Sequence, residues 1–459
     1  MPYKLFSILP NCGANNPTMI MKYILLTTLS LILWATNPSI AAKPQTVKWN
    51  KETTEEKLLT RFLRYVSYDT QSDRNSKSYP STAKQLVLLK VLKSEMEALG
   101  MTEVTMDKYG YVMGTIPASK GYESAPVFGL LAHVDTAPIF TGANIKPQVI
   151  NEYDGKDIRL NDSLWMRVAD FPQLARFKGH KIVHTDGTTL LGADDKAGVA
   201  EIMTAAEYLM THPEFKHGKI RIGFTPDEEI SRGVDFFDVK AFGASAAYTM
   251  DSGLEGRIVY ENWNAAQAHL DIRGVSSHLG TAKGKLVSAL EIAFELHQML
   301  PKAERPQYTS GYEGFFHLLD MKGDVPHAEV NYQIREFDTK RFEERKALMR
   351  DLVNLLNKRY NGAIQLTIKD QYYNMRLKVD ERPEIVEKAL TAMRLAGITP
   401  TPAPGRGGTD GSRLSYMGLP CPNIFVGGMN YHSPYECCSV DMMERAFQVI
   451  LNLAELWGK

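Results

Sequence analysis

Two patterns of secondary structure occur along this chain, and the place where one interrupts the other constrains the fold more than any other feature. In the first half, apolar strands predicted at 127–132, 219–224 and 246–250 alternate with a helical segment at 199–210. Short continuous apolar runs of this kind are typical of parallel sheets that helices cover on both faces. The alternation therefore predicts a three-layer α/β domain.

The interruption at 263–375 is predicted to be a complete small domain inserted into the larger one. Its expected elements are strand, helix, strand, strand, helix and strand, at 265–272, 286–300, 315–321, 328–336, 340–360 and 363–370. This βαββαβ order is that of the ferredoxin-like α+β unit. Signals of the first kind resume after it, and an apolar stripe from Met443 to Trp457 predicts a closing helix. The larger domain should therefore consist of two parts, 51–262 and 376–459.

The first 42 residues differ from the rest of the chain. Lys22 precedes a thirteen-residue apolar run at 23–35, and small residues ending at Ala42 follow a polar break. Because a membrane span needs about 20 apolar residues, this pattern favours a secretory signal peptide at about 19–41 over a retained anchor. Residues 1–18 would be an upstream extension. The mature protein is expected to be exported, either periplasmic or secreted, with no stable membrane insertion after processing.

Charge and cysteine content argue against other classes of protein. The 53 basic and 53 acidic residues cancel, so nucleic acid, whose phosphates require a basic surface, is not an expected partner. The four cysteines are scattered and make no disulfide framework. Adjacent Cys437 and Cys438 could form only a strained bridge, so buried free thiols are expected there.

Carboxylate and imidazole side chains lie at the carboxyl ends of the predicted strands or just beyond, where open α/β sheets place their sites. The five segments carry His133 with Asp135, Asp194 with Asp195, Glu228 with Glu229, Asp251, and His432. Each segment alone has an ordinary explanation, such as a helix N-terminus, a solvated charge pair or a turn. Their joint placement instead predicts a metal site. Ligands of this kind without thiolate suit zinc, manganese or cobalt, and an excess of carboxylates can bridge two metal ions.

Two pairs among these residues have spacings that suit such a site. His133 and Asp135 point the same way in an extended chain, so Asp135 can accept the second ring N–H of His133. Glu228 and Glu229 would face apart in a regular strand, so a turn at 225–227 must aim both at the metals. One of them can then bind metal while the other handles protons.

Six motifs in register resemble those of the peptidase T family. Members of this family are tripeptide aminopeptidases and belong to the dizinc exopeptidases, also called aminoacylase-like metallopeptidases. They are HVDTAP at His133, LLGADDKAG around Asp194, FTPDEE at Glu228, AYTMDSG at Asp251, GRGGTDGSRLS at Arg406 and GGMNYH at His432. The resemblance runs from about Glu55 to Glu455. It implies a zinc-exopeptidase catalytic domain in two parts and an inserted domain that serves as a lid or in dimerisation.

The resemblance also implies the ligands of two zinc ions per subunit. One ion would be held by His133 and Asp251, and the second by Glu229 and His432. Asp194 would bridge the two.

Four further roles come from the same resemblance. Asp135 would orient His133, and Glu228 would be the general base for the attacking water. Arg406 would bind the C-terminal carboxylate of the peptide, because a guanidinium matches a carboxylate with two hydrogen bonds. His278, in the inserted domain, would reach towards the scissile carbonyl, although it is followed by Leu279 where the family commonly has proline.

Several alternatives stay open at this point. The same metal core would also suit a dipeptidase, a carboxypeptidase or an N-acyl amino acid deacylase. A non-catalytic peptide-binding protein of the cell envelope would also have two lobes and a signal, but binding needs no base such as Glu228. A short peptide is the expected partner in each peptidase reading, and a homodimer through the inserted domain is a further expectation. Family members are usually cytoplasmic, which is the alternative to export.

Overall fold

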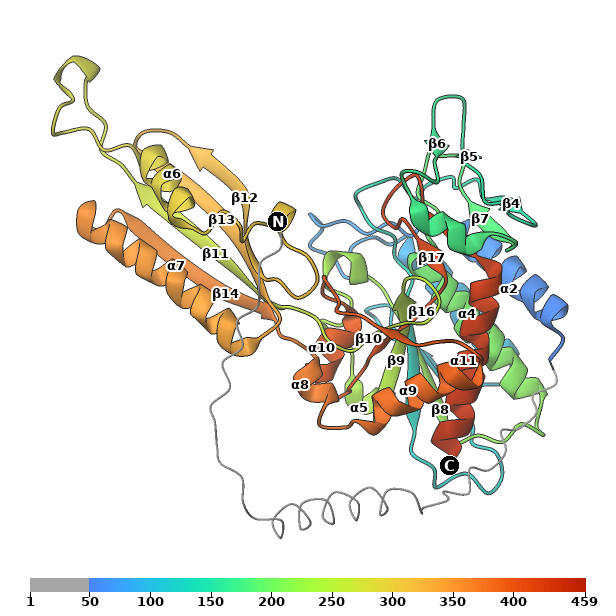
Figure 1. Ribbon diagram of the computed structural model, residues 1–459. Helices are drawn as coiled ribbons and strands as arrows, with labels where there is room; N and C mark the ends of the chain where they lie inside the picture. Colours follow the sequence, from blue (N-terminus) through green and yellow to red (C-terminus); the bar gives the residue numbers. More distant parts are fainter. Residues whose placement is uncertain (1–48) are drawn as a thin grey trace, which may run out of the picture. The chain divides into compact units, whose positions relative to one another are not determined.

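The computed structural model describes residues 49–459 (Figure 1). The predicted signal peptide and its upstream extension lie outside these residues. Within the described part, no helix has both the length and the apolar character that crossing a membrane requires.

A mixed eight-stranded sheet forms the centre of the larger domain, with the strand order β1-β2-β8-β3-β9-β16-β10-β15. Its strands are β1 (Thr102–Met106), β2 (Val112–Ile116), β3 (Phe128–His133), β8 (Ile220–Thr225), β9 (Ala246–Ser252), β10 (Arg257–Val259), β15 (Thr401–Pro402) and β16 (Asn423–Phe425). The middle strands β8, β3, β9 and β16 run parallel, whereas β2 and β10 run antiparallel to their inner neighbours. The strands predicted from apolar runs therefore make up the parallel middle of the sheet.

Helices cover both faces of this sheet, which confirms the predicted three-layer α/β class. One face packs against α2 (Lys51–Val66), α3 (Gln85–Ala98), α4 (Ala193–Thr211), α9 (Glu384–Leu395) and α11 (Val440–Gly458). The other face packs against the short helices α5 (Val239–Phe242) and α10 (Asp410–Tyr416), and α8 (Arg376–Val379) follows the inserted domain. Successive residues of a strand serve opposite faces, as Leu130 and Leu131 of β3 do.

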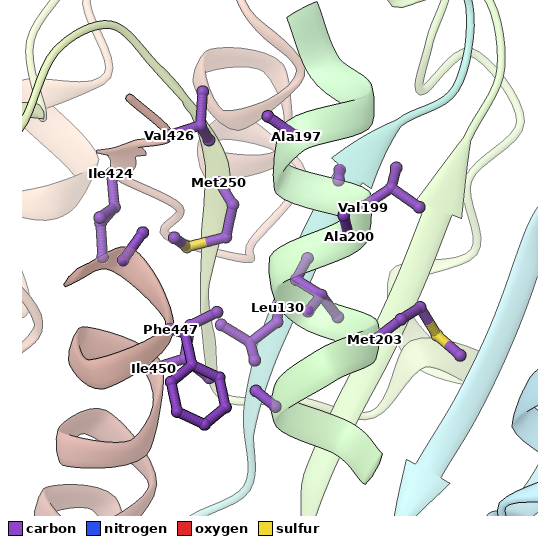
Figure 2. Packing of buried hydrophobic residues seen from close by; sticks show 14 of the residues in the cluster. Leu130, Ala197, Val199, Ala200, Met203, Met250, Ile424, Val426, Phe447 and Ile450 are labelled. Atoms are coloured by element: carbon purple, nitrogen blue, oxygen red, sulfur yellow. The ribbon is translucent and has the colours of Figure 1, made fainter. Parts of the chain in front are cut away.

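The core between α4, α11 and the sheet fixes the position of the strand ends (Figure 2). Leu130 and Met250 of the sheet lie among Ala200 of α4 and Phe447 of α11, and all four are fully or almost fully buried. A Cβ atom at Gly198 of α4 would overlap the backbone oxygen of Met250. Helix α4 therefore sits directly on β9, which brings the first turn of α4 close to the end of that strand.

The inserted domain has the predicted βαββαβ order. Its four-stranded antiparallel sheet has the order β12-β13-β11-β14, which is the ferredoxin-like arrangement. The elements are β11 (Asn264–Arg273), α6 (Ala289–Met299), β12 (Phe315–Gly323), β13 (His327–Glu336), α7 (Thr339–Arg359) and β14 (Ile364–Tyr372). Both helices pack on one face of the sheet, as Figure 1 shows, and the other face carries mostly polar side chains. The predicted fold class is confirmed for this part as well.

Three buried asparagines join the two segments of chain that connect the domains. The backbone N–H of Asn262 donates to Oδ1 of Asn374 (3.1 Å), and the N–H of Met375 donates to Oδ1 of Asn262 (2.8 Å). The N–H of Asn374 donates to Oδ1 of Asn264 (2.9 Å). These bonds lie at the predicted domain boundaries and tie the outgoing segment to the returning one.

A small second sheet of the larger domain was not predicted. Its order is β17-β18-β7-β4, with β4 (Gln148–Ile150), β7 (Ile182–His184), β17 (Gly428–Met429) and β18 (Cys437–Ser439), and a separate pair is formed by β5 (Ile158–Arg159) and β6 (Trp165–Met166). Cys437 and Cys438 lie in β18 as buried free thiols, as predicted. The loop between β17 and β18 carries His432.

Candidate metal and active site

The five predicted metal ligands meet beside the carboxyl ends of the parallel strands. His133 is the last residue of β3, Asp251 lies near the end of β9, Asp194 is in the first turn of α4, Glu229 follows β8 in a short 3-10 turn, and His432 lies between β17 and β18. Segments up to 299 residues apart in the sequence thus reach one place, since His133 and His432 both approach Asp194.

Their donor atoms form two groups that share Asp194. The donor atoms of His133, Asp194 and Asp251 all lie within 4.8 Å of one another, and so do those of Asp194, Glu229 and His432. Oδ1 of Asp194 is 3.0 Å from Nε2 of His133, and its Oδ2 is 3.1 Å from Nε2 of His432. Each oxygen of Asp194 therefore faces a different histidine, which is the arrangement of a carboxylate that bridges two cations.

The contacts of Nε2 in His133 and in His432 are explained better by a bound cation at each ring than by hydrogen bonds. Nε2 of His432 lies 3.1 Å from Asp194 and 2.9 Å from Glu229, while Nε2 of His133 lies 3.0 Å from Asp194 and 3.8 Å from Asp251. A ring nitrogen carries at most one hydrogen, whereas one cation can bind all three donors of a group. The donor set therefore fits two divalent metal ions.

Burial and crowding shift the protonation of these groups strongly. Burial raises the pKa of Glu229 to about 7, and burial together with neighbouring carboxylates raises the pKa of Asp251 well above its usual value. Burial acts to lower the pKa of His432, but the carboxylates of Asp194 and Glu229 raise it to about 11. So much negative charge in a buried place is stabilised when positive charge lies beside it.

Asp135 supports the site in two ways. Nδ1 of His133 lies 3.1 Å from the backbone oxygen of Asp135 and 3.4 Å from its carboxylate Oδ1, so Asp135 is in position to orient the ring. Its two carboxylate oxygens also accept the backbone N–H groups of Glu228 (2.9 Å) and Glu229 (3.2 Å). This fully buried carboxylate thus connects the end of β3 to the turn after β8.

The turn after β8 aims both glutamates at the site, as the sequence required. Asp227 adopts a left-handed conformation with φ of 60°. Its carboxylate accepts hydrogen bonds from the N–H of Ser81 (2.6 Å), from the Ser81 hydroxyl and from Nε2 of Gln85 (2.7 Å). These contacts hold the strained turn, so that Glu228 and Glu229 begin a 3-10 turn instead of continuing the strand.

Glu228 lies beside the ligands in an environment that favours its protonated form. Burial raises the pKa of Glu228 well above its usual value; the His133 ring opposes the shift, and the carboxylates of Asp251 and Asp410 add to it. Such a carboxyl group accepts and holds a proton more readily than an ordinary glutamate does.

A cavity of about 650 Å³ opens over these groups, a volume typical of sites for small ligands. Glu228 and Arg406 both line it, together with four of the five ligands, Asp194, Glu229, Asp251 and His432. The Arg406 guanidinium lies 4.7 Å from the ring centre of Trp263 and donates to the backbone oxygens of Gly311 (3.0 Å) and Thr309 (3.3 Å). Arg406 therefore belongs to the same cavity as the ligands and also contacts a loop of the inserted domain.

His278 is not brought to this cavity. It is exposed, it precedes a 3-10 turn at Leu279–Thr281, and its Nδ1 accepts the N–H of Gly280 (3.2 Å). Of the described residues, those that line the cavity do not include His278. Its predicted approach to the scissile carbonyl stays a prediction.

Sequence reasoning missed three buried carboxylates next to the site, Asp227, Asp410 and Glu436. Asp227 was seen only as part of a turn. Glu436 directly precedes the buried stretch from Cys437 to Val440. An acidic residue next to a continuous buried run is the signal that could have found it, because a buried charge requires partners.

Comparisons with known proteins agree with this arrangement. A family model described as peptidase dimerisation domain matches residues 260–363. A curated relative from Geobacillus sp. (strain WCH70), named peptidase T, is 52% identical over 406 residues, which are 88% of this chain and 99% of the relative.

Solved structures with the same fold include three bacterial proteins. The chain is similar to an aminopeptidase PepT from Bacillus cereus, with a TM-score of 0.71 and 24% identity over 88% of this chain and 99% of the other. A tripeptidase from Staphylococcus aureus has a TM-score of 0.70 and 22% identity over 88% and 98%. A dinuclear metal-binding peptidase of the M20 family from Bacillus subtilis has a TM-score of 0.58 and 16% identity over 88% and 98%.

Proposed function

Because the chain belongs to the peptidase T family of M20 metallopeptidases, we propose that it releases the N-terminal residue from tripeptides. The observation that carries this proposal is the pair of three-residue ligand groups that share Asp194, with Glu228 beside them in one cavity. A binding protein would need no buried carboxyl group next to two cation sites. In hydrolysis, that carboxyl group can accept the proton of the attacking water.

Zinc is the metal that we assign to both positions. His133 and Asp251 would hold one ion and Glu229 and His432 the other, with Asp194 between them. Two imidazoles and three carboxylates without thiolate match the ligands of catalytic zinc. When bound, the ions would polarise the scissile carbonyl and lower the pKa of a water molecule between them.

Glu228 is the proposed general base. Its carboxylate takes the proton of the attacking water, and its raised pKa lets it hold that proton more readily than an ordinary glutamate does. The protonated Glu228 carboxyl group then delivers the proton to the amine of the leaving dipeptide. No covalent intermediate with the protein is required.

Arg406 is the proposed contact for the C-terminal carboxylate of the substrate. It lines the cavity that the metal ligands also line, so the two ends of a short peptide can be fixed at once. Trp263 and the loop at 309–311 hold the guanidinium and limit its freedom. A peptide long enough to contact both the metal ions and Arg406 binds best, which accounts for a preference in peptide length.

The test is hydrolysis of Leu-Gly-Gly by the purified protein, with and without a chelator, next to a dipeptide, a tripeptide amide and an acylated amino acid. We expect rapid release of leucine from the tripeptide, slower turnover of the other substrates and loss of activity with the chelator. Preference for the dipeptide or for the acylated amino acid would instead assign the protein to one of the related dizinc activities. Activity that resists complete metal removal would overturn the proposal.

A homodimer is proposed on the basis of the dimerisation domain at 260–363. Light scattering coupled to size exclusion measures the mass directly, and a monomer at micromolar concentration would contradict it.

Export is proposed from the sequence pattern of residues 19–41 alone. N-terminal sequencing of the protein from its native host tests this, since processing near Ala42 is expected and an intact leader would contradict it.

A further inference from the structure

Glu436 is a buried carboxylate that accepts three backbone hydrogen bonds from a single segment. Only 1% of its surface is exposed. Its Oε2 accepts the N–H groups of Leu191 (2.7 Å) and Gly192 (2.9 Å), and its Oε1 accepts the N–H of Asp194 (3.1 Å). Both oxygens are therefore used on the chain that leads into α4.

This segment has a conformation that needs support. Gly192 has a left-handed backbone with φ of 79°, and Asp194 has non-helical angles (φ −86°, ψ 102°) within the first turn of α4. The N–H groups at the start of a helix have no partner within the helix. Glu436 provides that partner here, so the conformation that directs the Asp194 carboxylate is fixed by an acceptor from another part of the chain.

The same residue lies four positions after His432, in the loop between β17 and β18. That loop is held by its own hydrogen bonds, from Nδ2 of Asn430 to the oxygen of Tyr435 (3.2 Å) and from the Ser433 hydroxyl to the oxygen of Asn430 (2.6 Å). His432 has a left-handed backbone with φ of 60°. Glu436 thus connects a loop that carries one proposed ligand to a segment that carries the shared ligand.

We propose that Glu436 is a positioning residue of the metal centre, which sets the distance between Asp194 and His432 without binding metal itself. This inference rests on the metal ligands proposed above. Its consequence is that loss of Glu436 weakens metal binding, because the two ligands must then find their positions at the cost of binding free energy. Carboxylates that support ligands in this way typically account for about 10–100-fold in metal affinity or activity.

The variant Glu436→Gln tests this role with little change in volume. The amide presents an N–H to one of the three backbone donors and has no charge, so at least one bond is lost. Metal affinity is measured by competition with a chelator on protein reloaded with Zn²⁺, and metal content is measured in parallel. We expect affinity to fall by about 10–100-fold, with activity restored by excess Zn²⁺.

A matched control is Glu444→Gln in α11. Glu444 is also fully buried and accepts hydrogen bonds, from Nε1 of Trp49 (2.7 Å) and from Gln448, but it supports no ligand segment. Its zinc affinity should equal that of the unaltered protein. A second readout is the shift in melting temperature caused by Zn²⁺, which should shrink in Glu436→Gln and stay unchanged in Glu444→Gln.

The outcomes separate the two hypotheses. If the unaltered protein binds two zinc ions and Glu436→Gln binds them as tightly, the positioning role is overturned while the metal centre stands. Equal destabilisation of the metal-free and the loaded form, with unchanged affinity, would likewise reduce Glu436 to a structural residue. If the unaltered protein binds no zinc at His133 and His432, the metal centre itself is wrong. Should Glu436→Gln not fold, Glu436→Asp, whose carboxylate is one methylene shorter, is judged by the same criteria.

Discussion

Histidine and carboxylate side chains cluster in two regions of the described chain, and the regions behave differently. At the edge of the central sheet, His133 and Asp194 are largely buried, and their ring and carboxylate atoms meet in groups of three. On the open face of the inserted domain, Asp271, His327 and Glu329 also bring donor atoms within 4.8 Å of one another. There, however, the residues are half-exposed or exposed, and His327 simply pairs with Asp271 at 3.0 Å.

The comparison shows that residue type and spacing do not make a metal site. Water can satisfy every donor on the open sheet face, so nothing there requires an ion. At the buried edge, most of the donor residues are shielded from bulk solvent, charges are crowded, and further carboxylates such as Asp135 fix the backbone of the ligands. Substitutions in the two regions should therefore differ greatly in effect.

The largest effect is expected from Glu228→Gln. Loss of a general base lowers kcat by about 10²–10⁴-fold, while the zinc content should stay unchanged because Glu228 is not a proposed ligand. Steady-state kinetics with a tripeptide and elemental analysis measure the two quantities. Near-normal kcat would remove Glu228 from the mechanism and weaken the claim that the buried edge is catalytic.

The next effect is on stability, because the buried edge rests on a packed core. Leu130→Ala in β3 should lower the free energy of unfolding by about 2–5 kcal/mol, measured by urea denaturation. The control is Leu355→Ala in α7 of the inserted domain, where 48% of the side chain is exposed and the change should be within about 0.5 kcal/mol. Equal losses would mean that the two regions are not packed as differently as described.

A smaller effect is expected when a supporting carboxylate is altered. Asp135→Asn places an amide N–H against the backbone N–H groups of the Glu228 turn and should reduce zinc affinity or kcat/KM by about 10–100-fold. The matched change on the open face, Asp271→Asn, should leave both quantities unchanged. A comparable loss in Asp271→Asn would contradict the distinction between the regions.

The smallest effect is expected from His327→Ala, with zinc content and kcat unaltered. The hydrogen bond to Asp271 raises the pKa of His327, so this pair stabilises the fold when the ring is protonated. The contribution is complete below the unfolded pKa of about 6.5 and is lost as pH rises through the raised folded pKa. Denaturation at pH 5 and at pH 9 should show a small difference between variant and unaltered protein at the lower pH that vanishes at the higher.

Much of the site could be predicted because parallel strands deliver residues to a common edge. His133, Asp251 and the Glu228 turn follow continuous apolar runs, which are visible in the sequence, and the inserted βαββαβ unit has elements of at least nine residues. The hairpin of β17 and β18 was missed because strands of two and three residues have no measurable periodicity. The contact between Glu436 and Asp194 joins residues 242 positions apart, and no local pattern encodes it.

The edge strand β1 and the start of helix α4 were missed for a different reason. Strand β1 has only partly buried or exposed residues, so it lacks the apolar signal of the middle strands. The helix predicted to begin at 199 actually begins at Ala193. Its first turn was missed because it contains Asp194 and Asp195, two polar residues in non-helical conformations. In both cases, polar residues interrupt the apolar pattern from which helices and strands are predicted.

The asparagine contacts of Asn262, Asn264 and Asn374 between the two connecting segments have a consequence for how the domains move. Amide groups carry no net charge, so neither ionic strength nor acidity alters the bonds that they form. Any swing of the inserted domain must either break these bonds or bend the chain beyond them. The asparagine bonds of the joint therefore keep the same strength in dilute and in salty surroundings, and in mildly acidic as well as neutral ones.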